Sequence, residues 1–159
     1  MSGDVRVFNR QRGRAVDTRM LRQMTRSLLE ETMGLEEFDV TVQLVGARAM
    51  AGLNQLHLQH EGPTDVITLD YSESRTAAGI TGEIFVCVDV AEEQARRYGA
   101  TWQAELARYV IHGILHLQGH DDQNAAGRRQ MKRAEGRLLK ELDGRFHLRK
   151  LAHKTKVSA

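Results

Sequence analysis

The alternation of apolar and polar positions predicts four short strands. Apolar and polar residues alternate along most of residues 4–9 and 38–45, which is typical of strands with one buried face. Residues 65–71 and 83–90 are rich in β-branched and apolar side chains, so two further strands are predicted there. The stretch between them, residues 72–82, is rich in Ser, Thr, Ala and Gly and predicts a mobile loop.

Apolar residues at intervals of three and four predict five helices, at residues 15–33, 48–58, 91–98, 102–117 and 123–142. Gly99 and Gly119 end the third and fourth helices, and Thr101 is placed to cap the fourth. Helices before, between and after four strands predict an α+β fold. We expect a single small mixed β-sheet of about four strands packed with about five helices.

Length and composition fit one folded domain. The chain has 159 residues, of which 41% are hydrophobic and 28% charged. We expect a single domain over residues 1–146 and a basic, disordered tail over residues 147–159. There is one cysteine, Cys87, which excludes an intrachain disulfide, and no apolar run reaches the ~18 residues of a membrane span. These features predict a cytoplasmic protein with no membrane association.

Charge is distributed unevenly although the net charge is only +2. Both ends of the chain are rich in Arg and Lys, and the middle is acidic. Basic ends can contact nucleic-acid phosphates, but solvated surface and a frayed tail produce the same composition. Charge alone favours the second interpretation.

The most informative segment lies at the end of the fourth helix. His112 and His116 are four residues apart, so their imidazoles project from one helix face and can reach one metal ion. Gly119 permits a positive φ, which lets the chain turn back, and His120, Asp121 and Asp122 follow this turn. A metal site is predicted, with two core histidines as the alternative.

This spacing matches the metal-binding pattern of metzincin-type zinc proteases, with one difference. Those enzymes carry a Glu directly after the first histidine as general base, and here that position is Gly113. The metal ligands of a peptidase are therefore present without its base. A zinc peptidase is the less favoured alternative.

The sequence from His112 to Asp121, His-Gly-Ile-Leu-His-Leu-Gln-Gly-His-Asp, resembles the signature of the bacterial YbeY family, H-G-x-L-H-L-x-G-[YH]-D-H. Leu53-Asn54, the stretch Pro-Thr-Asp-Val-Ile-Thr-Leu of residues 63–69, and Gly-Glu-Ile of residues 82–84 resemble further family motifs in the same order. The spacing of Gln94-Ala95 and of Met131 and Glu135 also fits. The resemblance covers residues 38–142.

Membership would imply a single-strand-specific, metal-dependent endoribonuclease. Such an enzyme acts in ribosomal RNA processing, at the 3′ end of 16S rRNA, and in ribosome quality control. The implied partners are single-stranded RNA, rRNA and the ribosome or its small-subunit proteins, with no DNA specificity. The implied cofactor is one divalent metal ion, Zn²⁺, held by three side chains.

The third ligand departs from the usual family histidine, because the tenth residue after His112 is Asp122. A carboxylate is an accepted zinc ligand, and it also makes Mn²⁺ easier to bind. His120 is the rival third ligand. Asp121 is a candidate to orient a histidine or to cap the next helix.

Other candidate residues precede the metal segment. Asn54, Thr64 and Asp65 are candidates to line the cleft, with turn and cap roles equally open. Leu58 stands where the family has an Arg that suits a phosphate contact, and His57 and His60 flank it.

The predicted mechanism is metal-assisted phosphodiester hydrolysis with a metal-bound water, and no side-chain base is identified. The alternative is a non-catalytic factor that binds RNA or the ribosome and carries a metal ion.

Overall fold

The chain folds around one mixed four-stranded sheet. The structure is a computed structural model that describes residues 2–58, 64–72, 79–120 and 122–152, without the side chains of residues 2, 57 and 58. The strand order is β1-β2-β4-β3. The strands are β1 (Ser2–Asn9), β2 (Glu37–Val45), β3 (Val66–Asp70) and β4 (Gly79–Cys87). The first three in this order are parallel, and β3 is antiparallel to β4.

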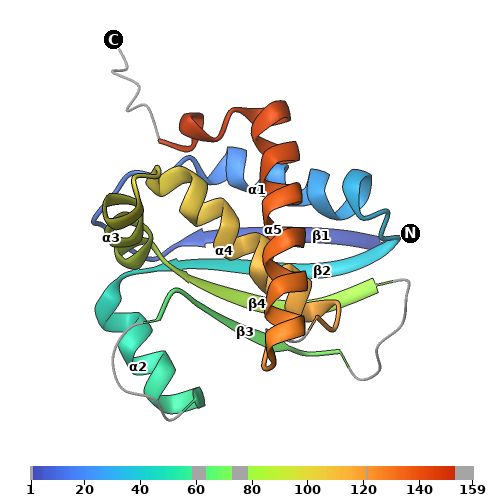
Figure 1. Cartoon of the computed structure of the whole chain (residues 1–159), viewed down its shortest axis with the longest axis horizontal. Helices are drawn as coiled ribbons and strands as arrows, with labels where there is room; N and C mark the ends of the chain where they lie inside the picture. Colours follow the sequence, from blue (N-terminus) through green and yellow to red (C-terminus); the bar gives the residue numbers. More distant parts are fainter. Residues whose placement is uncertain (1, 59–63, 73–78, 121, 153–159) are drawn as a thin grey trace.

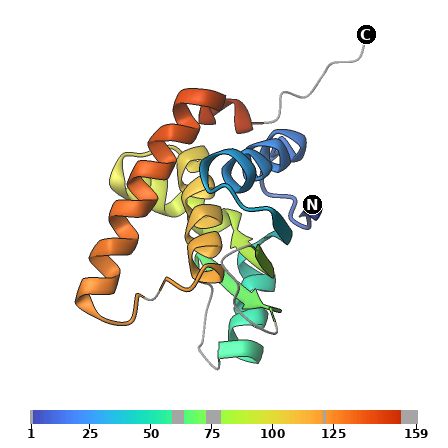
Figure 2. The ribbon, with the colours of Figure 1, turned by 90° about the vertical axis from the view of Figure 1, so that its right-hand side faces the viewer.

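Five α-helices pack with the sheet, and α4 occupies the centre. The helices are α1 (Thr18–Ser27), α2 (Ala47–Leu58), α3 (Val88–Tyr98), α4 (Trp102–Leu117) and α5 (Ala125–Phe146). A π-helical turn, Leu28–Thr32, extends α1, and a 3₁₀ helix, Leu148–Leu151, follows α5. Figures 1 and 2 show α4 between the sheet and α5. The predicted α+β fold with a mixed sheet and five helices is confirmed.

The core lies between one face of the sheet and the helices α1 and α4. Phe38, Val40, Val42 and Leu44 alternate inward along β2, as the sequence pattern predicted, and each is at most 4% exposed. Removing this apolar area from water is the main force that holds α4 on the sheet.

Two glycines allow α4 to approach β4 closely. A Cβ atom at Gly113 would lie 2.7 Å from Cγ2 of Ile84. A Cβ atom at Gly82 would lie 2.5 Å from Cδ2 of Leu117. Because both distances are far below van der Waals contact, glycine at these positions sets how deeply α4 sits. That depth fixes the height of the histidines above the sheet.

The fourth strand lies earlier in the chain than predicted, which corrects the prediction of residues 83–90. Residues 79–82 belong to β4 because Ile80, Gly82, Ile84 and Val86 point inward in alternation. Gly82 looked like part of a loop, yet it is required where Leu117 packs. The remainder of the predicted loop, residues 73–78, lies outside the described residues.

Residues 88–90 form the first turn of α3 and not the end of a strand. Val88 and Val90 favour a strand by composition, but Asp89 accepts a hydrogen bond from the backbone N–H of Ala47 at 2.7 Å. This contact between the starts of two helices outweighs the local preference.

The ends of other elements also differ from the prediction. The first helix begins at Thr18 because the side chain of Asp17 accepts from the N–H of Met20 at 3.0 Å. The last helix continues past Leu142 to Phe146.

The expected tail is corrected as well. Leu148 and Leu151 are 3% and 0% exposed, and the N–H of Asp17 donates to the carbonyl of Leu151 at 2.8 Å. Residues 147–152 therefore pack on the folded core, because two of their leucines bury apolar surface. Residues 153–159 lie outside the described part of the chain.

No helix within the described residues is both long enough and apolar enough to cross a membrane.

Candidate metal centre

Helix α4 positions the two histidines. Thr101 caps the helix as predicted, with its Oγ1 accepting from the N–H of Ala104 at 3.1 Å. One helical turn separates His112 from His116, and their Nε2 atoms lie 3.1 Å apart. Both nitrogens therefore point to one place beside the helix.

The turn after α4 brings a carboxylate to the same place. Gly119 has φ +99, and its N–H donates to the carbonyl of His116 at 2.9 Å. The chain reverses here, as the glycine predicted. Oδ2 of Asp122 consequently lies 3.6 Å from the Nε2 atoms of both His112 and His116.

These three donor atoms fit a divalent metal ion. Tetrahedral zinc with ligand bonds of ~2.0–2.2 Å places its donors about 3.3–3.6 Å apart. The observed separations are 3.1, 3.6 and 3.6 Å. The side chains of His112, His116 and Asp122 are 23%, 31% and 35% exposed. A site with three protein ligands and access to solvent is typical of catalytic rather than structural zinc.

Glu135 orients the ring of His112, a role that the sequence does not predict. Its Oε2 forms a hydrogen bond with Nδ1 of His112, which leaves Nε2 of that ring directed at the site. Its Oε1 lies 3.8 Å from Nη1 of Arg108. A carboxylate behind a ligating histidine fixes the tautomer and orientation of the ring.

A sequence signal for Glu135 does exist. Glu135 lies on the buried side of α5 with Met131, Ala134 and Leu138, and it is only 6% exposed. A Glu on the apolar face of a helix needs a buried partner. The sequence does not reveal that this partner is His112, because 23 residues separate the two.

The carboxylates around His112 favour positive charge at this position. Burial lowers the pKa of His112, whereas the hydrogen bond with Glu135 and the charges of Glu135, Asp122 and Asp65 raise it. The net result is a raised pKa. The same carboxylates would stabilise a bound cation.

The other predicted candidates have different positions. Among the described residues, His120 is not part of the group whose donor atoms lie within 4.8 Å of one another. It lines a separate hollow of about 360 Å³ with Arg137 and Glu141. Asp121 lies outside the described residues, and Asn124, not Asp121, caps α5 by accepting from the N–H of Gly127 at 2.7 Å.

The residues predicted to line the cleft lie near β3 and α2. Oδ1 of Asp65 accepts from the N–H of Val66 at 2.8 Å and lies 3.4 Å from Oγ1 of Thr64. These contacts match the turn role, which was one of the two alternatives for Asp65. The negative charge of Asp65 also helps to raise the pKa of His112. Asn54 is buried in α2. His60 and the side chains of residues 57 and 58 lie outside the described part.

Gly113 explains why a peptidase base is absent. The position faces Ile84 of β4 and not the metal centre. Any side chain there would collide with the sheet, so a Glu could not serve as general base at this packing depth.

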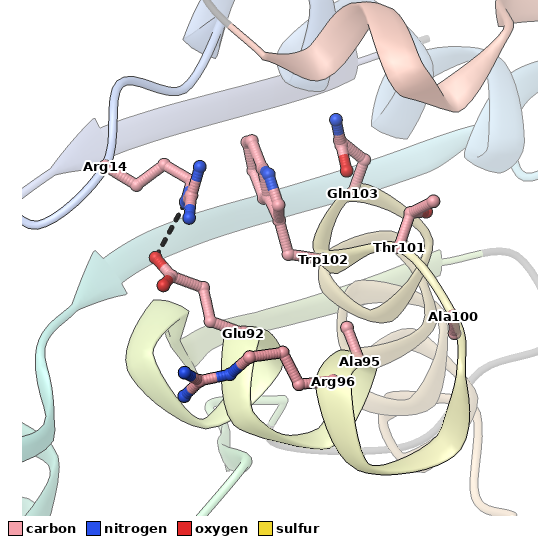
Figure 3. Close-up of a pocket in the computed structure, with 8 residues that line it drawn as sticks. All are labelled: Arg14, Glu92, Ala95, Arg96, Ala100, Thr101, Trp102 and Gln103. Carbon is pink, nitrogen blue, oxygen red and sulfur yellow. Dashed lines mark hydrogen bonds and ion pairs between the residues drawn. The ribbon is translucent and has the colours of Figure 1, made fainter.

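A second hollow, of about 390 Å³, lies at the other end of α4 (Figure 3). Nε of Arg14 donates to Glu92 at 2.7 Å, and the Arg14 guanidinium lies 5.1 Å from the centre of the Trp102 ring. Ten residues of helix separate Trp102 from His112, about 15 Å along the axis. The hollow is therefore separate from the metal centre.

A family model described as Endoribonuclease YbeY matches residues 6–143 of the chain. The chain belongs to the YbeY endoribonuclease family. Endoribonuclease YbeY of Chlorobium luteolum is 36% identical over 109 residues, which cover 69% of this chain and 77% of that protein. The Chlorobium limicola YbeY is 36% identical over 131 residues, covering 82% and 88%.

Endoribonuclease YbeY of Pelotomaculum thermopropionicum is 34% identical and covers 87% of this chain and 97% of that protein. The solution structure of TM1509 from Thermotoga maritima matches with a TM-score of 0.68 and 28% identity, covering 98% of this chain and all of that one. The resemblance to the YbeY family and the prediction of an endoribonuclease are confirmed. Neither the non-catalytic factor nor the peptidase is favoured.

Proposed function

We propose that this YbeY-family protein hydrolyses phosphodiester bonds of single-stranded RNA at a metal centre held by His112, His116 and Asp122. The observation that carries the proposal is the triangle of donor atoms, with sides of 3.1, 3.6 and 3.6 Å, open to solvent on one side. The family supplies the substrate class.

Each residue has a defined part in this proposal. A divalent ion bound by the three side chains would supply a Lewis acid and a water of lowered pKa. Glu135 holds the His112 ring through Nδ1, so that Nε2 is free to ligate the ion that the site would bind. Asp122 contributes one negative charge, so the centre keeps positive charge to offset a phosphate.

We further propose zinc as the metal, since two imidazoles and one carboxylate form a known catalytic zinc set. Mn²⁺ is the second choice because the carboxylate is a hard ligand. The proposed role in maturing the 3′ end of 16S rRNA, the ribosomal partners and the cytoplasmic location rest on the family resemblance.

The first test is the metal content of purified full-length protein and three variants. We expect about one equivalent of zinc in the wild type and its loss in His116→Ala and Asp122→Ala. His120→Ala is the matched control and should retain zinc, because His120 is outside the donor triangle. Loss of zinc in His120→Ala with retention in Asp122→Ala would make His120 the third ligand.

The second test is cleavage of single-stranded RNA, double-stranded RNA and casein by the same samples. We expect cleavage of single-stranded RNA only, abolished by a chelator and restored by zinc. Cleavage by His116→Ala that equals the wild type would refute the assignment of catalysis to this centre.

A further inference from the structure

Helix α5 carries a concentration of exposed positive charge. Its stretch of residues 128–137 exposes five cationic side chains, Arg128, Arg129, Lys132, Arg133 and Arg137. The acid in this stretch is Glu135, which is buried against His112. Every exposed charged side chain in this part of α5 is therefore cationic.

These charges are not neutralised within the described part of the chain. No carboxylate described there lies within ion-pair distance of any of the five. Arginines on other elements behave differently, since Arg6 pairs with Asp39, and Arg14 with Glu92 at 2.7 Å. Like charges held together on one helix cost free energy, which a bound polyanion would recover.

Two of the five cations share one edge of α5 with Glu135. Arg128 and Lys132 are four residues apart, and Glu135 follows Lys132 by three, so the three residues lie along one edge of the helix. Glu135 contacts His112, which shows that this edge faces the metal centre. Along the helix axis Lys132 is about 4–5 Å, and Arg128 about 10–11 Å, from Glu135. Figure 2 shows α5 along the outside of α4, on the side away from the sheet.

We propose that Arg128 and Lys132, the α5 basic edge, bind backbone phosphates of the RNA strand beside the cleaved bond. This inference rests on the proposed function, because the edge leads to the metal centre assigned to cleavage. Arg and Lys donors suit phosphate oxygens, and contacts to phosphate need no particular base sequence.

The test compares two double variants of the full-length protein that remove the same charge. Arg128→Gln with Lys132→Gln alters the α5 basic edge, and Arg96→Gln with Arg97→Gln alters exposed positions of α3. Affinity for a short fluorescent single-stranded RNA is measured by anisotropy against salt concentration, with protein stripped by a chelator. The salt dependence of kcat/KM is measured with zinc-loaded protein.

We expect the α5 variant to reduce the slope of log affinity against log salt by about 1.4, or about 0.7 for each lost phosphate contact. The α3 variant should keep the wild-type slope in both assays. The proposal would be overturned if the α5 variant kept the wild-type slope, or if the slope fell equally in the α5 and α3 variants. If the wild-type protein binds RNA and the variants show the expected difference in slope, but the zinc-loaded protein does not cleave RNA, the proposed function is refuted while the RNA-binding surface is supported.

Discussion

At the scale of single residues, the metal centre depends on a small number of geometric requirements. Two histidines one turn apart, a glycine with positive φ and one aspartate bring three donor atoms within reach of one ion. The histidine pair, the turn and two candidates for the third donor, Asp122 and His120, can be read from the sequence because they lie within eleven positions. Glu135 could not be assigned in that way, since only packing of α5 on α4 brings it to His112.

Replacing Glu135 by Gln tests the support behind His112. Gln keeps the size of the side chain and removes the charge, so the ring loses its strong acceptor. We expect zinc affinity to fall by about 10–100-fold while the fold is retained. The measurement is competition with a chromophoric chelator, with circular dichroism as the check on folding.

Glu141→Gln is the matched control on the same helix, because Glu141 is exposed and its one ion pair among the described residues is with Arg145 at 3.2 Å. It should leave zinc affinity unchanged. Equal affinities for the two variants would mean that Glu135 is no more than a buried residue of the core.

At the scale of elements, local pattern determined which segments form helices and strands, and contacts determined where they end. The inward alternation of β2 and the Thr101 cap of α4 were predicted correctly. The structure of residues 79–82 and 88–90 was not predicted correctly. Gly82 is needed for close packing against Leu117, and Asp89 accepts a hydrogen bond from the start of α2. Those partners are far away in the sequence.

The packing of α4 on β4 is tested by Gly113→Ala, with Gly136→Ala as the matched control. Alanine at 113 would place Cβ 2.7 Å from Ile84, whereas nothing lies within 4 Å of the corresponding atom at 136. Overpacking costs about 1–3 kcal/mol, partly offset by about 1 kcal/mol of helix propensity. At position 136 alanine causes no overpacking, so it should only raise the stability by about 0.5–1 kcal/mol through its higher helix propensity.

We therefore expect Gly113→Ala to unfold at lower urea concentration than Gly136→Ala, with a stability difference of about 1–3 kcal/mol. Urea titrations followed by circular dichroism give both values. If Gly113→Ala were as stable as Gly136→Ala, glycine at 113 would not be needed for helix packing.

At the scale of the whole molecule, the sheet order and the α4–α5 contact combine distant segments into one site. Order β1-β2-β4-β3 places the antiparallel β3 at one edge, beside the helix that carries the histidines. Asp65, just before β3, contributes its charge to His112 through this arrangement. No local pattern specifies such a neighbourhood.

Metal binding should stabilise the whole domain, because the three donor atoms converge only in the folded chain. Zinc at 100 times its dissociation constant should add about 2.7 kcal/mol to the free energy of unfolding. For a chain of this size the midpoint of thermal unfolding rises by about 5–10 °C. Differential scanning calorimetry with and without zinc measures the shift.

His116→Ala should show no such shift, because one donor of the triangle is missing. An equal shift in the variant and the wild type would place the stabilising zinc at another site.

The sequence by itself determined the type of most elements, the histidine pair on one face of α4, the turn at Gly119 and the family. These follow from interactions between residues close in the chain, where periodicity and spacing carry the information. Tertiary structure decided the choice of Asp122 over His120 in the donor triangle, the partner of Glu135, the folding of residues 147–152 and the edge of α5 that faces the metal centre. Each of these depends on how helices pack on the sheet, and packing joins residues whose separation in the sequence leaves no local pattern.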